Sequence, residues 1–431
     1  MKTPRPHTTS PFRGAQDGSF LIVVMWVTAI MVSVALYFGH AMLMEYRASS
    51  YAAAGYEAAQ AIEGARRHIE YVLDELTLPG DLPSSDVMNL DGVVVGNAKY
   101  WIIGRDYDSV FALTDPVFGF QDQSSKLDLN RVEYERLLWL PGIPLGVPER
   151  INDWRDDDDE LTGDYGAESQ DYLLGDPAYY AKNGDFESVE ELRLVLTADY
   201  DYLYGEDTNR NGVLDPNEDD GDASLPNDDM DGELDFGIIE FVAVDIGEPT
   251  SHPYIEELLG ESEDGETSSD RVNVSDPQGQ EPLRTLLGAV LGDRTEEIMN
   301  SLRNWPYQSV LEFYAASGMT AEEFAQVDGL VYQQTPDAEP PALINVNTAS
   351  EEALACALAT ITDAELLAEQ IIAYRQGLDA TSLNSLAWVA EAIESSMYPA
   401  VGPLIKGTTF QLAADIAAVG LDRACEQLEQ R

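Results

Sequence analysis

The sequence predicts an α+β fold: one long N-terminal helix packed on a small antiparallel sheet, with a large helical insert. Three observations lead to this class. An apolar run continues into an Ala-rich segment with helical periodicity that ends near residue 79. Runs of β-branched and aromatic residues follow within residues 80–121. A pattern of short strand and helices then begins three times, at Lys126, Arg271 and Leu343.

The first element is the apolar segment Ser19–Met44, which contains no Asp, Glu, Lys or Arg. A helix rises about 1.5 Å per residue, so a run of this length crosses the hydrocarbon core of a bilayer. Lys2, Arg5 and Arg13 precede it, and positive charge on that side keeps the N-terminus cytoplasmic. We therefore expect a single membrane span, with the bulk of the chain on the other side.

The helix is expected to continue through residues 45–79. An apolar stripe recurs on one face at the 4-3-4-3 spacing of a helix, namely Ala48, Ala52, Gly55, Ala59 and Ile62. Small residues near the membrane allow neighbouring helices to approach closely. Pro79 and Gly80 then end the helix.

Three short runs predict antiparallel strands packed on this helix: Val93–Val95, Lys99–Ile103 and Ser109–Leu113. Near the other end of the chain, residues 399–431 contain the alternating segment Gly407–Gly420. We expect that segment to return to the same sheet as a C-terminal strand.

The insert consists of three related helical modules, expected at residues 122–235, 271–335 and 336–398. Each begins with a short strand, an Asn and Ser or Thr side chains that can cap the following helix. The third copy resembles a helix-hairpin-helix (SAM-like) module, and Leu140–Ile143 is the corresponding hairpin turn of the first. Between the first two modules, residues 236–270 hold one expected strand, Phe236–Gly247, and an acidic linker.

The charge balance excludes several partners. Lys and Arg number 24 against 79 Asp and Glu, for a formal net charge of −55. Such a chain repels nucleic-acid phosphates and anionic lipids and attracts divalent cations. The hairpins are also almost free of basic residues, which argues against a DNA-binding role. The two cysteines, Cys356 and Cys425, either pair in an oxidising compartment or are unrelated buried thiols.

The most specific motif is the twelve-residue segment Asp207–Glu218, which fits the calcium-loop pattern D-x-[DN]-x-[DN]-G-x5-E. Gly212 supplies the sharp turn at the sixth position. The Val213 carbonyl and five side chains are the expected calcium ligands, the side chains being those of Asp207, Asn209, Asn211, Asp215 and Glu218. An acidic turn exposed to solvent is the alternative.

Two further acidic segments match less closely. Asn227–Asp235 imitates the loop through Asp229, Asp231 and Asp235, but its twelfth position is Ile238. In the segment that begins at Asp153, three carboxylates are positioned to converge on another cation: Asp156, Asp158 and Glu168. A solvated run of charges is the competing interpretation.

No catalytic set emerges from the sequence. The chain has only four histidines: His7, His40, His68 and His252. They lie in the leader, the apolar segment, the long helix and a linker. No Ser-His-Asp or Cys-His set, phosphate loop or zinc pattern can be assembled around them, so we expect no enzyme.

Several segments together resemble the minor pseudopilin K family of the type II secretion system. The start, Gly18 followed by SFLIVVMW, resembles the family's leader end and first mature residues. DWRDDDDELTGDYGAESQDY and PAYYAKNGDFESVEELRLV resemble its helical insert, and NVNTASEEAL its later helical module. The resemblance extends over nearly the whole chain.

The resemblance implies a pseudopilin fold and a processing step. Residues 1–18 would be a prepilin leader, cut after Gly18 by a prepilin peptidase that then N-methylates Ser19. The mature protein would sit in the inner membrane with its bulk in the periplasm. It would join the I and J minor pseudopilins, and other pseudopilins, at the tip of the pseudopilus, prime filament assembly and support export through the outer-membrane secretin. Calcium is associated with the family's helical insert.

Two features depart from the family. Asp17, rather than Arg or Lys, precedes Gly18, whereas Arg13-Gly14 is the more usual pair. Cutting after Gly14 would place charged Asp17 at the third mature position, so Gly18 is favoured. The chain also has three modules rather than two. A minor pilin of a type IV pilus and, less favoured, a membrane-anchored helix-hairpin-helix DNA receptor are the alternatives.

Overall fold

A computed structural model of the chain describes residues 17–74, 80, 90–105, 117–196, 200–221, 223–260, 268–336, 338–379, 382–413 and 415–420. The chain divides into two compact units. One contains the N-terminal helix up to Gly64, Val94–Lys99 and the chain from Ala418 onward. The other contains Ala65–Val93 and Tyr100–Ala417.

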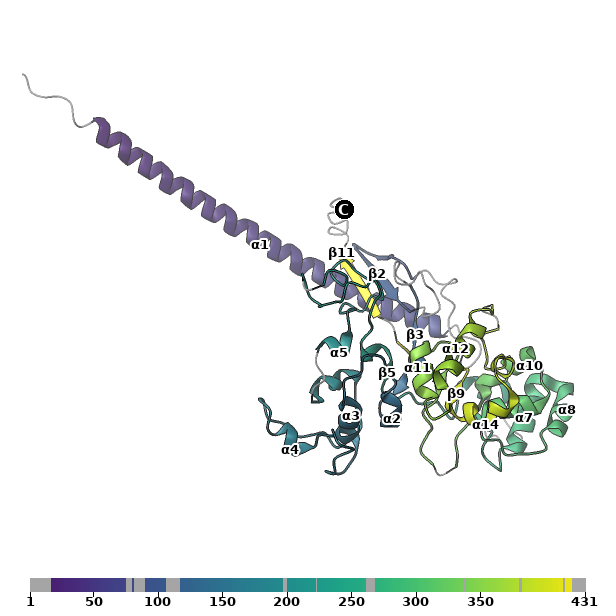
Figure 1. Ribbon diagram of the computed structural model, residues 1–431. Helices are drawn as coiled ribbons and strands as arrows, with labels where there is room; N and C mark the ends of the chain where they lie inside the picture. Colours follow the sequence, from purple (N-terminus) through teal and green to yellow (C-terminus); the bar gives the residue numbers. More distant parts are fainter. Residues whose placement is uncertain are drawn as a thin grey trace, which may run out of the picture. The chain divides into compact units, whose positions relative to one another are not determined.

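The N-terminal helix, α1, runs unbroken from Asp17 to Asp74 (Figure 1). Its sequence has no Pro and is rich in Ala, which favours a continuous helix. Among the described residues it is the one helix long and apolar enough to cross a membrane, and its most apolar window has a mean hydropathy of 2.5 with no buried residue. The predicted long helix is confirmed, and the lipid around it stays a prediction.

A three-stranded sheet has the order β1-β2-β11, formed by Val93–Val95, Ala98–Ile103 and Asp415–Gly420. Gly96 lies between β1 and β2 with φ +61°, a conformation that glycine adopts without strain. The C-terminal strand therefore returns to the sheet, as predicted. The predicted strand Ser109–Leu113 lies outside the described residues.

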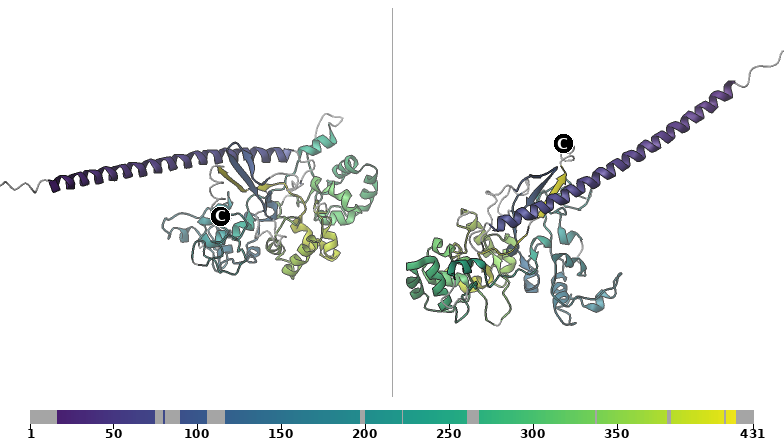
Figure 2. Two further views of the ribbon diagram at one scale, coloured as in Figure 1. Left: turned by 90° about the horizontal axis from the view of Figure 1, so that it is seen from above. Right: turned by 180° about the vertical axis from the view of Figure 1, so that it is seen from behind.

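The C-terminal end of α1 lies along this sheet (Figure 2). Ala61 and Ala65 are fully buried there. A Cβ atom added to Gly64 would be 3.6 Å from Cγ2 of Val95, an ordinary packing distance. One turn further, Nδ1 of His68 is 2.9 Å from the Tyr100 hydroxyl. The predicted packing of helix on strands is confirmed.

The three modules share one structural device: a pair of two-residue parallel strands near the start and end of each. In the first module, β4 (Leu127–Asp128) pairs with β5 (Val242–Ala243). In the second, β6 (Val272–Asn273) pairs with β7 (Val331–Tyr332). In the third, β8 (Ile344–Asn345) pairs with β9 (Ile405–Lys406). A further antiparallel pair joins β3 (Gln121–Asp122) to β10 (Leu412–Ala413). The segment boundaries proposed from sequence stay predictions.

At the end of the first strand of each pair, an Asp or Asn side chain stabilises the same local turn by accepting a backbone hydrogen bond. The side-chain oxygens of Asp128, Asn273 and Asn345 each accept the backbone N–H two residues later, at 2.9, 2.9 and 3.0 Å. Asp and Asn favour this local turn because their short side chains reach the backbone. In the first module the turn residue is thus Asp128 rather than the Asn of the repeat pattern.

The prediction of one strand over Phe236–Gly247 is wrong for most of its length. Ile238–Glu240 forms a 3-10 turn, and the strand β5 is limited to Val242–Ala243. Ile238, Ile239 and Phe241 are all buried in the core of the first module. Consecutive apolar residues were interpreted as a strand, but a tight turn buries them equally well.

The remaining helices are short and belong to the insert. Their bounds are α2 Tyr134–Leu137, α3 Val147–Arg155, α4 Ser169–Tyr172, α5 Tyr200–Tyr204, α6 Pro253–Leu259, α7 Gln280–Leu291, α8 Thr295–Ser301, α9 Val310–Ser317, α10 Ala321–Ala325, α11 Glu351–Ala357, α12 Ala364–Arg375, α13 Val389–Ala392 and α14 Tyr398–Val401. The Ser350 side chain accepts the N–H of Ala353 and caps α11, one of the predicted caps. Cys356 is a buried free thiol on α11, and Cys425 lies outside the described residues, so their pairing stays a prediction.

Candidate metal centre

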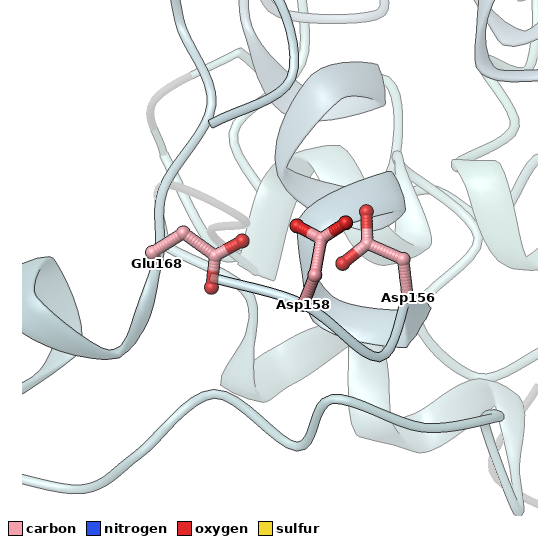
Figure 3. A group of neighbouring side chains, drawn as sticks. All are labelled: Asp156, Asp158 and Glu168. Atoms are coloured by element: carbon pink, nitrogen blue, oxygen red, sulfur yellow. The ribbon is translucent and has the colours of Figure 1, made fainter. Parts of the chain in front are cut away.

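Three carboxylates of the first module converge beside α3. Asp156 directly follows α3, Asp158 lies in the next turn, and Glu168 directly precedes α4. One oxygen from each lies within 4.8 Å of the others. Figure 3 shows the carboxylate of Glu168 directed toward those of Asp158 and Asp156. Calcium binds oxygens at about 2.3–2.6 Å, so oxygens this far apart can share one ion.

The electrostatics of this cluster favour a cation. Glu168 is only 4% exposed, and among the described residues neither of its carboxylate oxygens has a hydrogen-bond partner. Oδ1 of Asp156 also has none. Burial, followed by the negative charges of Asp153, Asp156 and Asp159, raises the pKa of Glu168 to about 7. A buried charge without a partner is costly, and a divalent cation would supply the missing partner.

Asp153 fixes the loop that carries the three carboxylates. It lies on α3, is fully buried, and is not directed at the cluster. Its Oδ1 accepts the N–H of Thr162 at 2.8 Å and its Oδ2 accepts the N–H of Ala167 at 2.6 Å. Because these bonds hold the far side of the loop against α3, Glu168 is brought back toward Asp156.

An aromatic cluster lies behind the loop. The ring centroids of Trp154 and Tyr172 are 5.3 Å apart, and those of Tyr172 and Tyr179 are 5.4 Å apart. Trp154 is on α3 and Tyr172 on α4. Aromatic pairs at this distance pack rigidly, so they set the spacing between the two helices that carry Asp156 and Glu168.

Substituting Gly166 by Ala is expected to destabilise the first module by about 1–3 kcal/mol, the usual range for overpacking. An added Cβ would be 2.2 Å from Oδ2 of Asp153 and 2.7 Å from the Thr162 carbonyl oxygen, so Asp153 would have to move. Denaturant unfolding of the full chain in detergent measures the change.

Gly184→Ala is the matched control, because its added Cβ would meet only the Lys182 carbonyl oxygen at 3.9 Å. Equal stabilities of the two variants would contradict the role given to Asp153.

The second candidate is the predicted loop, in which backbone hydrogen bonds orient each of the first three ligand side chains. Oδ1 and Oδ2 of Asp207 accept the N–H groups of Asn211 and Gly212, both at 2.9 Å. Oδ1 of Asn209 accepts the N–H of Asn211 at 3.0 Å, and Oδ1 of Asn211 accepts the N–H of Val213 at 2.7 Å. Gly212 has φ +70°, the turn for which a glycine was predicted at this position.

The remaining predicted ligands close the loop. Nδ2 of Asn209 is 2.8 Å and Nδ2 of Asn211 2.9 Å from Oδ2 of Asp215, while Oε2 of Glu218 accepts the Asp215 N–H at 3.0 Å. The two side-chain amide groups thus donate hydrogen bonds to one oxygen, Oδ2 of Asp215, and positive charge is favoured beside this oxygen. Glu218 is 1% exposed, and burial followed by the charges of Asp207, Asp215 and Glu206 raises its pKa to about 7. The residues present fit a hard cation.

The third candidate is more open. Asp229, Asp231 and Asp235 are exposed, and among the described residues they do not form a group of three convergent carboxylates. The backbone of Asp235 does join this segment to the loop beside it, because its N–H donates to Oε2 of Glu206 at 3.1 Å and its carbonyl accepts the Glu206 N–H at 2.9 Å. An independent site here stays a prediction.

Sequence reasoning missed three residues that support these sites: Asp153, Glu206 and Asn183. Asn183 lies well beyond the acidic run, yet its Nδ2 donates to the Asp158 carbonyl at 2.6 Å. Its Oδ1 is buried without a partner. No spacing pattern marks a residue that reaches the cluster through tertiary packing. The predicted processing residues, Gly18 and Ser19, lie in the first turn of α1, and cleavage there stays a prediction.

Comparison with known proteins finds a family similarity within the first module. Residues 111–203, which include the Asp156–Asp158–Glu168 cluster, match the family model described as type II secretion system (T2SS), protein K. The type II secretion system protein K of Pseudomonas aeruginosa is 43% identical over 74 residues. That match covers 16% of this chain and 22% of the relative, so the chain spans about a fifth of the relative's length.

The solved structures matched include the crystal structure of the GspK-GspI-GspJ complex from the enterotoxigenic Escherichia coli type 2 secretion system. The identity is 13% with a TM-score of 0.28, over 67% of this chain and 84% of that chain. At this TM-score the match supports no argument about the arrangement of this chain. Over its residues 111–203, the chain is therefore similar to the type II secretion system protein K family.

Proposed function

We propose that the chain is a minor pseudopilin at the tip of the type II secretion pseudopilus, with no enzymatic activity. The observation that carries the proposal is the family match over residues 111–203, in a chain that also contains the 58-residue helix α1. There the chain would prime filament assembly with the I and J minor pseudopilins and support export of folded proteins through the outer-membrane secretin.

The proposed location follows from α1. Its N-terminal half exposes large apolar side chains such as Phe20, Trp26 and Leu36, which suits either lipid or the helices of neighbouring subunits. A prepilin peptidase in the inner membrane would cut after Gly18 and methylate Ser19. The N-terminus of the unprocessed chain would be cytoplasmic and the modules periplasmic.

We further propose that calcium is the resident ion of the first module. Asp156, Asp158 and Glu168 would hold one ion and the Asp207–Glu218 loop another. Calcium prefers six to eight oxygen ligands. The cluster offers buried carboxylate oxygens that have no partner among the described residues, and the loop offers the side chains and spacing of a calcium loop. The ion would neutralise these charges and fix the loops that carry them, which keeps a bulky insert rigid. Nucleic acid is not a proposed partner, because the net charge of −55 opposes it.

Copurification tests the proposed function. The full chain, affinity-tagged and expressed with the I and J proteins of the same secretion system, is expected to retain both in detergent with calcium present. A chain carrying Glu168→Gln and Glu218→Gln should retain less, and one carrying Asp157→Asn and Asp219→Asn, exposed neighbours of the same charge, should match the wild type. A wild-type chain that retains neither protein would contradict the assembly role.

A further inference from the structure

One buried arginine contacts the calcium loop from outside. Arg105 lies two residues beyond the end of β2, and its side chain is 5% exposed. Its Nε donates to Oε1 of Glu240 at 2.9 Å, and its Nη2 donates to the Arg210 carbonyl at 3.2 Å. The same Nη2 lies 3.6 Å from Oδ2 of Asp207. The guanidinium therefore meets the first and fourth positions of the predicted loop.

The contact extends along the turn of the loop. Arg210 has a left-handed backbone with φ +58°, which costs energy for a residue with a side chain unless its surroundings hold it. A Cβ atom added to Gly212 would be 3.4 Å from Cδ, Nε and Nη1 of Arg105. The arginine thus packs against the sharpest part of the loop.

The guanidinium also donates a hydrogen bond to the backbone that follows β2. Nη1 donates to the Gly104 carbonyl at 3.0 Å, and the Gly104 N–H donates to the Val117 carbonyl at 2.8 Å. The Ile102 carbonyl accepts the Gly119 N–H at 3.1 Å. One side chain therefore connects the last residues of β2 with the loop and, through Glu240, with the turn that precedes β5.

We propose that Arg105 is the positioning residue of the calcium loop and that it transmits occupancy of the loop to the end of β2. This inference rests on the calcium binding proposed above for Asp207–Glu218. The planar fork of arginine can hold Asp207, Glu240 and a carbonyl at fixed angles, which a lysine ammonium cannot do. When an ion fixes Asp207, the guanidinium and hence the Gly104 carbonyl lose freedom as well.

A positioning role and a purely electrostatic role of Arg105 predict opposite effects on the calcium affinity of the loop. The positive charge of Arg105 beside Asp207 repels a second cation, so charge alone weakens calcium binding. The hydrogen bonds of the fork keep Asp207 and Arg210 in the shape that binds, so geometry strengthens it. Arg105→Lys keeps the charge without the fork, and Arg105→Gln removes both.

Calcium titrations of the full chain in detergent micelles distinguish the two. All variants carry Glu168→Gln, so that the loop remains as the principal site. We expect both Arg105→Lys and Arg105→Gln to weaken calcium binding by roughly 10-fold or more, the usual effect of losing a residue that orients a metal ligand. Tighter binding by Arg105→Gln, or wild-type affinity in Arg105→Lys, would overturn the proposal.

Amide hydrogen exchange measures the coupling between the loop and the end of β2, which the calcium affinity of the loop does not report. With Arg105 present, saturating calcium is expected to slow exchange at Ile102 and Gly104, whose N–H groups donate to the Leu90 and Val117 carbonyls. In Arg105→Lys at saturating calcium this protection should be lost. Equal protection in both proteins would show that the loop and the strand are not coupled through this side chain.

Removing Arg105 takes one ion-pair partner away from the buried Glu240, which endangers folding. The double variant Arg105→Gln with Glu240→Gln removes both charges and keeps hydrogen-bonding groups at both positions, and it should show the same loss of affinity and protection. A parent protein with Glu168→Gln that binds no calcium would overturn the proposed loop site itself. A parent that binds calcium, together with unaffected Arg105 variants, would overturn only the role of the arginine.

Discussion

Removing calcium from the full chain is expected to lower its melting temperature by about 5–10 °C for each occupied site. An ion at about 100 times its dissociation constant stabilises the folded state by about 2.7 kcal/mol. For a chain with large cooperative units, each kcal/mol shifts the melting temperature by about 2–4 °C. Scanning calorimetry in detergent, with calcium and with a chelator, measures the difference.

Four variants locate the effect. Glu168→Gln and Glu218→Gln keep the size of each side chain and remove its charge, so each should abolish part of the calcium-dependent shift. Asp157→Asn and Asp219→Asn change exposed carboxylates in the same acidic runs and should keep the whole shift. A shift lost equally in all four variants would indicate diffuse screening of a chain with a charge of −55 rather than two sites.

The pH dependence of stability is expected to change sign when calcium is added. Without calcium, the pKa values of Glu168 and Glu218 rise from 4.5 to about 7, because burial and nearby carboxylates disfavour their charged forms. Between these values the folded state holds protons that the unfolded state has released, so stability rises as pH falls from about 7 toward about 5. Each group contributes up to about 3 kcal/mol.

With calcium bound, the same carboxylates are ionised and protons compete with the ion. Stability should therefore decrease as the pH falls from about 7 toward about 5. Titratable groups outside the sites, Asp328 and His252 among them, act in both conditions. Burial raises the pKa of Asp328 to about 7, and burial with the charge of Arg271 lowers that of His252. Because their contributions do not depend on calcium, the difference between the two curves isolates the metal sites. Unfolding free energies measured from pH 5 to pH 8 with and without chelator test this, and parallel curves would contradict it.

Local patterns in the sequence were sufficient for the elements that obey a single period. The apolar and Ala-rich run predicts α1, and the alternation of Ala98, Tyr100 and Ile102, all buried, predicts the inward face of β2. The motif spacing likewise predicts the loop at Asp207, because its glycine turn and side-chain hydrogen bonds form within twelve consecutive residues.

Elements set by tertiary contacts were not predictable in the same way. Two-residue strands such as Val242–Ala243 are shorter than any periodic signal, and their partner Leu127–Asp128 lies more than a hundred residues away. Asp153 and Arg105 are ordinary charged residues in the sequence, and only the fold reveals that one supports the Asp156 cluster and the other the calcium loop. The prediction of the Asp156, Asp158 and Glu168 cluster rested on proximity along the chain, and α3 and α4 bring those residues together.

The parallel pairs that join the two ends of each module have an architectural consequence. Neighbouring strands in a sheet lie about 4.8 Å apart, so the chain leaves each module almost where it entered. For the second module the points of entry and exit are Val272–Asn273 and Val331–Tyr332. A module of this kind is topologically a side loop on the chain. Its length can therefore change with little displacement of the flanking backbone, and the same holds when a whole module is gained or lost. A chain with three such loops can therefore vary in bulk while the path from α1 to β11 stays the same.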